Sequence, residues 1–365
     1  MSSIWGNNFK ISIFGESHSS AIGGVLDGIP AGIHLDLDEI NFEMARRAPG
    51  KNNLSTTRNE KDSFEILSGY FQGHTTGTPL AFIIRNTNNR SKDYDELKKL
   101  MRPGHADYTG NVKYNGYNDY RGGGHFSGRL TAPLVFIGSV AKQYIKAKQG
   151  IIIGSRVKSI GTIIDEQIEL NTELKADIVE SFKLKKIPTI NEEKGIEMEK
   201  YILDAKTEGD STGGVIQCFC MNVPTGLGAP FFESFESSLA HLIFSVPAVK
   251  GLEFGKGFDI TRIKGSQAND EMFYSNDLVK TYTNNNGGIL GGITNGMPVI
   301  FNVAIKPTPS ISKEQKTVNI YKKKDDTLGI KGRHDPCIVP RALPVIESCA
   351  AITIFDYLLQ MEGII

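Results

Sequence analysis

The chain has 365 residues, of which 39% are hydrophobic and 22% charged, a globular composition that excludes a wholly disordered chain. The 41 basic residues balance 41 acidic ones, so no nucleic-acid partner is expected and any anion site must be local. The apolar runs at 80–84 and 134–137 are too short to span a bilayer, and residues 1–14 lack the pattern of a secretion signal. We therefore expect a cytoplasmic protein without a membrane partner.

The first part of the chain alternates strand and helix patterns. Strands are expected at 9–14 and 22–29, separated by a polar turn. Asp36, followed three residues later by Glu39, is typical of a helix start, and the helix ends near Arg47. Two further strands, 64–71 and 80–85, flank a turn at 73–77. Apolar residues at helical spacing then predict a helix at 130–148.

The second part begins with a polar stretch, 159–200, which we expect to be a peripheral excursion with one helix at 171–182. Further elements are predicted from their apolar patterns: helices at 197–207, 236–244 and 346–359, and strands at 215–222 and 299–305. Three polar segments without periodicity, 51–62, 90–93 and 307–332, are expected to be loops that close around ligands.

The four cysteines form no C-x-x-C pair, so the sequence predicts neither a disulfide framework nor a metal site. Two of them, Cys218 and Cys220, lie on one expected strand, and we expect them on opposite faces.

One motif occurs twice with identical spacing. Gly73-x-Thr-x-Gly77-x-Pro79 precedes the strand at 80–85, and Gly292-x-Thr-x-Gly296-x-Pro298 precedes the strand at 299–305. Upstream of each copy, Gly-Gly-Val, Pro-x-Gly and a helix follow in the same order. Unless these matches are coincidences in a chain with 39 glycines, they predict one domain, 1–365, built from two pseudo-repeats at roughly 8–150 and 200–360.

Histidines in turns are the first candidates for chemistry. Four of the seven, His18, His105, His125 and His334, lie in turns rich in Gly or Pro, beside Arg, Ser or Asp. A single loop histidine is more often structural than catalytic, but imidazole is the side chain that titrates near neutral pH. Because of their neighbours, the segments 15–18 and 101–107 are candidates for general acid–base chemistry.

The segment 121–129, Arg-Gly-Gly-Gly-His-Phe-Ser-Gly-Arg, leads into the helix expected from 130. Three consecutive glycines expose backbone N–H groups, and a helix start adds free donors, both of which suit a phosphate. The segment matches neither G-x-G-x-x-G nor a Walker A motif, and a flexible surface loop is the alternative. The arginines of this neutral chain favour an anionic ligand, namely Arg46, Arg47, Arg102, Arg121, Arg129 and Arg341.

Together these segments resemble the chorismate synthase family, which converts 5-enolpyruvylshikimate 3-phosphate to chorismate and phosphate in the shikimate pathway of aromatic amino-acid biosynthesis. Three separate family signatures are present, at 15–30, 121–129 and 333–347, and shorter matches occur at 102–107, 208–214 and 306–308. The resemblance therefore covers essentially the whole chain.

The resemblance implies an α+β fold, a β-α-β sandwich of antiparallel sheets around helices with an internal pseudo-twofold repeat, assembled as a homotetramer. It implies a lyase that acts on a phosphorylated small molecule by an anti-1,4 elimination that is redox-neutral overall. The implied cofactor is reduced FMN, FMNH2, which is thought to lend an electron transiently.

Residue roles follow by position from the same resemblance. His18 resembles the general acid for the departing phosphate, His105 the proton donor to reduced flavin near N1, and Asp335 with Ser17 the relay for the flavin N5 proton. The positions implied to contact flavin are His125, Phe126, Ser127, Pro247, Ala248, Gly291, Lys306, Pro307, Thr308, Pro309, Ser310 and Arg333. The positions implied to bind substrate or NADP are Arg46, Arg47, Arg129 and Arg341.

Several positions depart from the common family pattern. Ser19 replaces a usual glycine, Asn53 replaces an arginine, and Pro247 replaces an asparagine. The second signature has His125-Phe126-Ser127-Gly128 where Arg-Ser-Ser-Ala is frequent. Asn53 argues against NADPH binding, so we expect a monofunctional enzyme that depends on an external flavin reductase.

Two other functions remain as alternatives. The first is a flavin oxidoreductase with net electron transfer, but such an enzyme has no need of a leaving-group acid such as His18. The second is a binding protein for a phosphorylated ligand or nucleic acid; the neutral charge and the single Trp weigh against nucleic acid.

Overall fold

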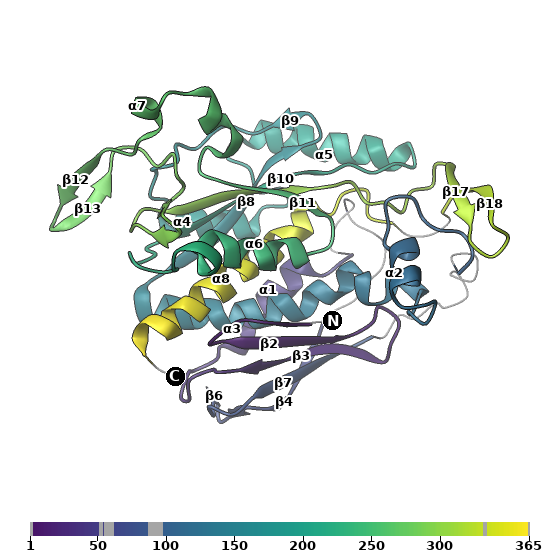
Figure 1. Cartoon of the computed structure of the whole chain (residues 1–365), viewed down its shortest axis with the longest axis horizontal. Coiled ribbons are helices and arrows are strands. Elements are labelled where there is room, and N and C mark those ends of the chain that lie inside the picture. The colour runs from purple at the N-terminus through teal and green to yellow at the C-terminus, as the bar shows by residue number, and fades with distance from the viewer. Residues whose placement is uncertain (1–2, 51–53, 55–61, 87–97, 331–333, 364–365) are drawn as a thin grey trace.

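Two antiparallel sheets enclose a layer of helices in the computed structural model, which describes residues 3–50, 54, 62–86, 98–330 and 334–363 (Figure 1). The first sheet has the strand order β1 (Ile4–Trp5), β2 (Lys10–Gly15), β3 (Ala21–Asp27), β7 (Leu80–Arg85) and β4 (Phe64–Ser68). The second has the order β11 (Val249–Phe254), β16 (Val299–Ile305), β10 (Gly214–Met221), β8 (Ile152–Ile160) and β9 (Ile163–Ile164). This arrangement confirms the predicted sandwich of antiparallel sheets around helices.

Four helices fill the space between the sheets: α1 (Leu37–Arg47), α3 (Thr131–Gln149), α6 (Phe235–Ser245) and α8 (Val339–Glu362). Asp36 caps α1 by accepting hydrogen bonds from the backbone N–H groups of Asp38 and Glu39, as its sequence predicts. The helix α8 packs along α3 and contacts both α1 and the second sheet. It is long and apolar enough to cross a membrane, but its apolar window is wholly buried, so the fold uses it as a core helix.

The repeated motifs make the same hydrogen bonds in both halves of the chain. The Thr75 hydroxyl donates to Pro30 O and accepts from Ile33 N, at 2.7 and 3.0 Å. The Thr294 hydroxyl donates to Pro224 O at 2.7 Å and accepts from the N–H of residue 227 at 2.9 Å. Each threonine is the last residue of a two-strand turn, β5 (Tyr70–Phe71) with β6 (His74–Thr75) or β14 (Ile289–Leu290) with β15 (Ile293–Thr294). The repetition in sequence is thus a repetition of local structure.

The outer face of the second sheet is covered by the stretch expected to be peripheral. Its helices are α4 (Ala176–Leu184) and α5 (Glu192–Thr207), and α4 contributes Val179 to a small core with Phe219 and Met221. The prediction that Cys218 and Cys220 face opposite sides is wrong: both lie in the main core, and it is Phe219 between them that faces outward. Residues two apart on a strand share a face, because side chains alternate with period two.

Other boundaries differ from the sequence prediction for local reasons. The helix α5 begins five residues before the expected 197, because Asn191 caps it. The helix α8 begins at Val339, with Pro340 in its first turn, where a proline costs little, and it continues through Pro344 inside the helix. The segment expected as a loop, 307–332, contains the hairpin β17 (Gln315–Asn319) and β18 (Lys324–Leu328).

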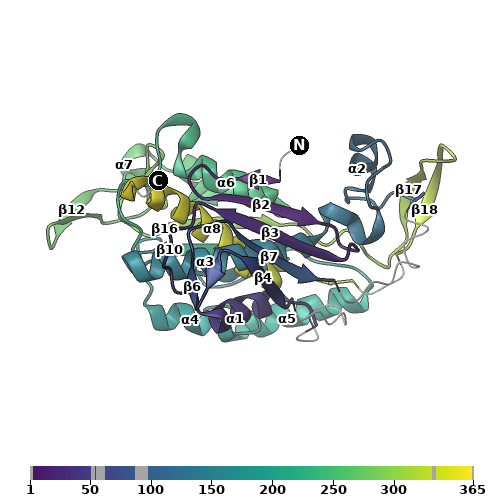
Figure 2. The same ribbon diagram turned by 90° about the horizontal axis from the view of Figure 1, so that it is seen from below.

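Short elements stand off the two ends of the sandwich. At one end the helix α2 (Asp107–Lys113) lies beside the β17–β18 hairpin, and the view from below shows both beyond the strands of the first sheet (Figure 2). At the other end the hairpin β12 (Met272–Ser275) and β13 (Leu278–Thr281) projects near α7 (Gly265–Ala268). The segment between α2 and α3 contains η2 (Arg121–Phe126), whose three glycines have non-helical backbone angles, and the short helical turn η3 (Gly128–Leu130), which leads into α3.

Candidate active site

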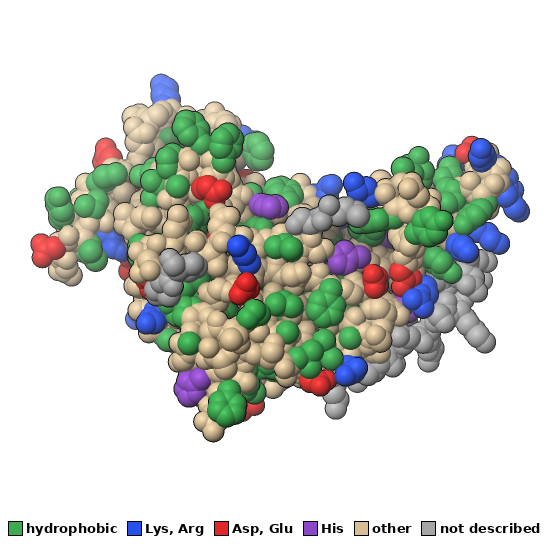
Figure 3. All heavy atoms as spheres, turned by 60° about the horizontal axis from the view of Figure 1, so that its bottom comes forward, with side chains coloured by type: hydrophobic (Ala, Val, Ile, Leu, Met, Phe, Trp, Pro, Cys, Tyr) green, Lys and Arg blue, Asp and Glu red, His purple; other side chains and the backbone are tan. Residues whose placement is uncertain are grey.

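A cavity of about 920 Å³ opens beside the helical layer, lined by residues that are far apart in the sequence. Its walls come from β1 and β2, from the loops around 102–106 and 122–130, from the end of α6, from 306–310 and from the start of α8. Figure 3 shows histidine and basic side chains on the face between the main body and the arm that carries β17–β18. Loops from both halves of the chain therefore build one site.

The glycine loop packs directly against two histidines. A Cβ atom added to Gly122 would lie 2.4 Å from Cε1 of His18, and one added to Gly123 would lie 3.0 Å from Cε1 of His105. Both glycines have positive φ angles, 59° and 87°. Only residues without a side chain permit this approach, so one short backbone segment holds both imidazoles at the cavity. In the structure this loop packs closely against the two histidines. Its binding of a phosphate stays a prediction.

Two arginines of the cavity share one buried carboxylate. Asp62 accepts hydrogen bonds from Arg47 and Arg129, one on each carboxylate oxygen, and its side chain is wholly buried. Burial opposes the charge on Asp62, but the positive charges of Arg47 and Arg129 outweigh it and hold the pKa of this carboxyl below its usual value. Asn86 Oδ1 also accepts from Arg129 Nε at 3.1 Å. Asp62 therefore holds the guanidinium groups of Arg47 and Arg129 in place at the cavity wall.

A third arginine is attached to the same wall. Arg341 Nη1 donates to Asp335 Oδ2 at 2.5 Å, and its Nε donates to the backbone carbonyl of Arg47 at 3.0 Å. These contacts join the start of α8 to the end of α1, so the cavity brings Arg47, Arg129, Arg341 and Asp335 together as the sequence motifs suggest.

The lining carries an excess of positive charge. Among the described residues that line the cavity, six are cationic and one is a carboxylate, the cations being Arg47, Arg102, Arg129, Arg341, Lys250 and Lys306. Asp62 and Asp107 pair with some of them from behind, yet cations still outnumber the carboxylates. A cavity of this size and charge suits anionic small molecules, because desolvated guanidinium groups bind phosphate and carboxylate through paired hydrogen bonds.

The comparisons with known proteins agree with this site. The family model for chorismate synthase matches residues 9–359. The chain belongs to the chorismate synthase family. It is 44% identical over its whole length to the chorismate synthase of Dehalococcoides mccartyi, 98% of which is covered. It is also 44% identical to that of Methanocaldococcus jannaschii, with 98% of this chain and 96% of the relative covered. A crystal structure of chorismate synthase matches with a TM-score of 0.75 and 33% identity, over 98% of this chain and 94% of that one.

Chorismate synthase activity is the elimination of phosphate from 5-enolpyruvylshikimate 3-phosphate, which yields chorismate in the last step of the shikimate pathway. The chain is accordingly a carbon–oxygen lyase of aromatic amino-acid biosynthesis, and its substrate is a phosphorylated small molecule. The predicted fold, enzyme class and reaction are confirmed.

Most of the positions that chorismate synthases are expected to use for flavin lie at the cavity. These are His125, Phe126, Ser127, Pro247, Ala248, Lys306, Thr308, Pro309 and Ser310. His125 Nδ1 donates to Gly15 O at 2.8 Å, which holds its ring at the edge of the first sheet. Ala248 has a positive φ of 75°, a strained conformation for a residue with a side chain and one often found at ligand sites.

The remaining expected positions lie elsewhere or beyond the described residues. Pro307 is not among the described lining residues, and Gly291 lies in the β14–β15 turn, outside the described cavity wall. Arg333 and Asn53 lie outside the described residues. Ser17 is buried directly before His18, and its hydroxyl has no hydrogen-bond partner in the described part of the chain.

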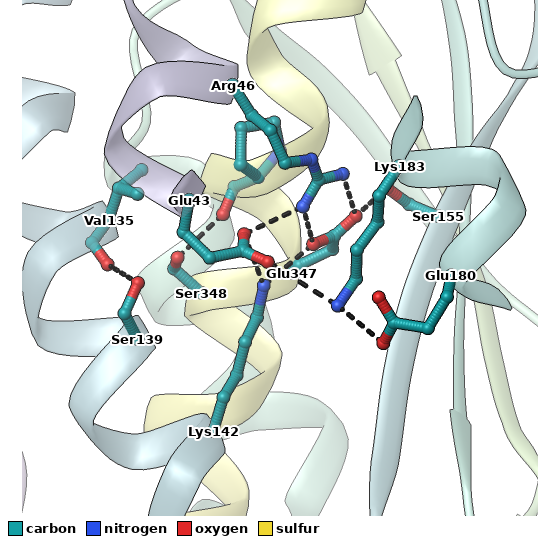
Figure 4. Close-up of polar contacts among 11 residues, drawn as sticks. Glu43, Arg46, Val135, Ser139, Lys142, Ser155, Glu180, Lys183, Glu347 and Ser348 are labelled. Atoms are coloured by element: carbon teal, nitrogen blue, oxygen red, sulfur yellow. Dashed lines mark hydrogen bonds and ion pairs between the residues drawn. The ribbon is translucent and has the colours of Figure 1, made fainter. Parts of the chain in front are cut away.

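Arg46 belongs to a different set of contacts. It donates to Glu347 at 2.6 and 2.8 Å and to Glu43 at 2.7 Å, and Lys142 donates to the same two carboxylates (Figure 4). Ser155 of β8 also donates to Glu347, at 2.7 Å. This buried ion network joins α1, α3, α8 and the second sheet, and Arg46 is absent from the described lining of the cavity. Its expected role in binding substrate or NADP therefore lacks geometric support.

Two site residues, Asp62 and Asp107, have no role of their own in the sequence prediction, although Asp107 lies in the candidate segment 101–107. Asp62 lies at the end of a stretch without periodicity, so only its contacts with Arg47 and Arg129 identify it. Asp107 follows His105 by two residues within the 102–107 motif, and this spacing could have predicted their contact from the sequence. His334 also lines the cavity, and burial, together with the charge of Arg102, lowers the pKa of its imidazole. The His334 imidazole therefore favours its neutral form.

Proposed function

We propose that this chain binds reduced FMN and the phosphorylated substrate together in the described cavity and that His18 and His105 supply its acid–base chemistry. The observation that carries the proposal is the Gly122–Gly123 backbone, which packs one glycine against each imidazole at a cavity rich in cations. An elimination of phosphate needs a proton donor for the leaving group and positive charge around it, and this wall offers both.

The structure also tests whether the residues present suit a flavin. The cavity has room for two small ligands, and the buried hydroxyl of Thr308, which lines it, has no hydrogen-bond partner within the described residues. A buried hydroxyl without a partner is costly, and a polar ligand would remove that cost. When bound, reduced FMN would lend an electron transiently and recover it, so that the elimination is redox-neutral. His125–Ser127, Pro247–Ala248 and Lys306–Ser310 would hold it.

The chain's own residues divide the remaining work. His18, 5% exposed, is the proposed general acid that protonates the departing phosphate. Arg47, Arg129 and Arg341 would bind the phosphate and carboxylates of the substrate and keep water out of the site. Asp335, paired with Arg341, and Ser17 are the proposed relay for the flavin N5 proton.

The proposal extends to the surroundings of the enzyme. It places the protein in the cytoplasm as a homotetramer, one domain per chain, that receives reduced FMN from an external flavin reductase and does not use NADPH itself. This rests on the family resemblance and on the presence of Asn53 in place of an arginine.

An anaerobic assay with chemically reduced FMN tests the proposal. We expect phosphate and chorismate to appear in equal amounts, and no net oxidation of the flavin. If FMN and substrate bind but no product forms, the protein would be a binding protein and not an enzyme. Stoichiometric oxidation of FMN would instead indicate an oxidoreductase. Adding NADPH with oxidised FMN should give no product, and product formation there would contradict the monofunctional assignment.

A further inference from the structure

Behind His105 lies the carboxylate of Asp107. Asp107 Oδ1 is 2.6 Å from His105 Nδ1, and its side chain is 7% exposed. Arg102 donates to Asp107 through Nε at 2.6 Å to Oδ2 and through Nη2 at 2.7 Å to Oδ1. The Arg102 backbone N–H adds a further bond to Oδ2 at 3.1 Å. Asp107 is thus held in one orientation by Arg102, with one oxygen directed at the imidazole.

The position of the proton between Asp107 and His105 follows from the donors and acceptors available. Burial alone favours the neutral acid, but hydrogen bonds from Arg102 and His105 outweigh it, so the pKa of Asp107 lies well below its usual value. An ionised carboxylate can only accept, so the proton in the 2.6 Å contact belongs to His105 Nδ1. Arg102 Nη2 also lies 3.0 Å from Nδ1, but it donates to Asp107 Oδ1 at the shorter distance of 2.7 Å. Without a proton on Nδ1, two acceptors, Nδ1 and the ionised Oδ1, would face each other at 2.6 Å, which is unfavourable.

The opposite edge of the ring faces the cavity wall. A Cβ added to Gly123 would lie 3.1 Å from His105 Nε2, and His105 lines the cavity, whereas Asp107 is absent from the described lining. The imidazole therefore lies between a carboxylate on its Nδ1 side and the glycine backbone on its Nε2 side. The Arg102 side chain also donates to Ser310 Oγ at 3.2 Å, which ties this arrangement to the loop proposed to hold flavin.

We propose that Asp107 is a positioning residue that fixes the orientation and tautomer of His105, with the proton on Nδ1 and with Nε2 presented to the cavity. The part of this inference that concerns catalysis rests on the proposed function of His105 as a proton donor, in which the imidazolium form gives up its Nε2 proton and keeps the proton on Nδ1. A histidine whose second nitrogen is held by a carboxylate is a recurrent device for fixing a ring in active sites. Arg102 acts in turn by holding Asp107.

Nitrogen-15 NMR of the full-length protein, labelled at histidine, reads the tautomer directly, without cofactor or turnover. The His105 signals are assigned by their loss in His105→Asn, and the spectrum is recorded on the alkaline side of the usual imidazole range. We expect the Nδ1–H tautomer for His105 in the unaltered protein. An Nε2–H tautomer there would overturn the proposal, and this result requires no variant of Asp107 to fold.

The variant Asp107→Asn provides a second test of the His105 tautomer. Its single carbonyl oxygen would remain with Arg102, so its amide N–H would face Nδ1 and the ring would change to the Nε2–H tautomer. A change of tautomer supports the proposal, and an unchanged Nδ1–H signal in folded protein contradicts it. The matched control is Asp119→Asn, which removes a similar pairing with Arg121 at 2.8 Å in a residue outside the described cavity wall. It should leave the His105 tautomer unchanged.

Activity then separates this inference from the proposed function. We expect Asp107→Asn to lower turnover about 10- to 100-fold, the usual effect of removing a group that orients a reactive one. We also expect it to change the absorption spectrum of bound reduced FMN. If the tautomer changes while turnover and spectrum stay normal, Asp107 still positions the ring, and the catalytic role of His105 is the part that fails.

Discussion

Replacing Gly122 by alanine perturbs the proposed acid without altering its chemistry. The new methyl group would lie 2.4 and 2.5 Å from Cε1 and Nδ1 of His18 and 2.7 Å from the hydroxyl of Ser17. Ordinary contacts are 3.4 Å or longer, so the imidazole must move by about 1 Å. A displacement of this size at a reacting group costs about 100-fold in rate. We therefore expect kcat to fall about 100-fold in Gly122→Ala while flavin affinity changes little.

The change also strains the backbone, because Gly122 has a φ of 59°, and a left-handed conformation costs a non-glycine residue about 1–2 kcal/mol. Gly116→Ala is the matched control. Gly116 also has a positive φ, 78°, but its added Cβ would have its nearest contact at 3.7 Å, with Asn111. Both variants should lose the stability that the left-handed conformation costs, Gly122→Ala the more because of its close contacts, and only Gly122→Ala should lose turnover.

Stopped-flow measurement of chorismate formation, under anaerobic conditions with saturating reduced FMN, gives kcat and KM for both variants. Turnover near that of the unaltered enzyme in Gly122→Ala would refute the close packing of this loop against His18. An equal loss in both variants would assign the effect to backbone strain in general and not to the imidazole.

Three further predictions concern the charged residues. His18→Ala should lower elimination about 100- to 10,000-fold and leave FMN affinity within a few-fold, as measured by flavin titration; normal turnover would remove His18 from the mechanism. Arg129→Lys should weaken substrate binding at constant net charge, because lysine cannot hold Asp62 and Asn86 and bind an anion together; a loss of stability with normal affinity would make Arg129 purely structural. Glu347→Gln should cost about 3–5 kcal/mol in urea unfolding, because Arg46 and Lys142 would then share the single carboxylate of Glu43 and buried positive charge would be in excess. Burial opposes ionisation of Glu347, but Arg46 and Lys142 lower its pKa below the ordinary 4.5. Its contribution to stability is therefore complete above pH 4.5 and is lost as the pH falls further, so the unaltered protein should lose more stability on acidification than Glu347→Gln.

Much of this molecule follows from local sequence alone. The cap at Asp36 and the apolar periodicity of 130–148 predict α1 and α3 to within a residue or two. The duplicated Gly-x-Thr-x-Gly-x-Pro motif predicts two equivalent turns, because the threonine bonds to backbone groups close to it in the fold. The signature segments identify the family, since they hold the residues that meet at the cavity.

Tertiary structure alone decides where neighbouring charges point. Arg46 and Arg47 are adjacent on α1, and both were candidates for binding an anion. Successive residues on a helix point about 100° apart, so Arg47 reaches the cavity while Arg46 enters the buried network with Glu347. Glu347 lies 301 residues away from Arg46 in the sequence, and no local pattern indicates that they meet.

The same limit explains why no local pattern identifies Asp62 as a partner of two arginines. Its contacts join the ends of three separate segments, and only the packing of α1 against α3 brings Arg47 and Arg129 to one carboxylate. Periodicity predicts which faces of the strands and helices are buried, and the resemblance to the family implies the sandwich of sheets and helices. The assembled fold decides which charges share a buried space, because an ion pair in the interior depends on distances that the chain sets only when it closes on itself.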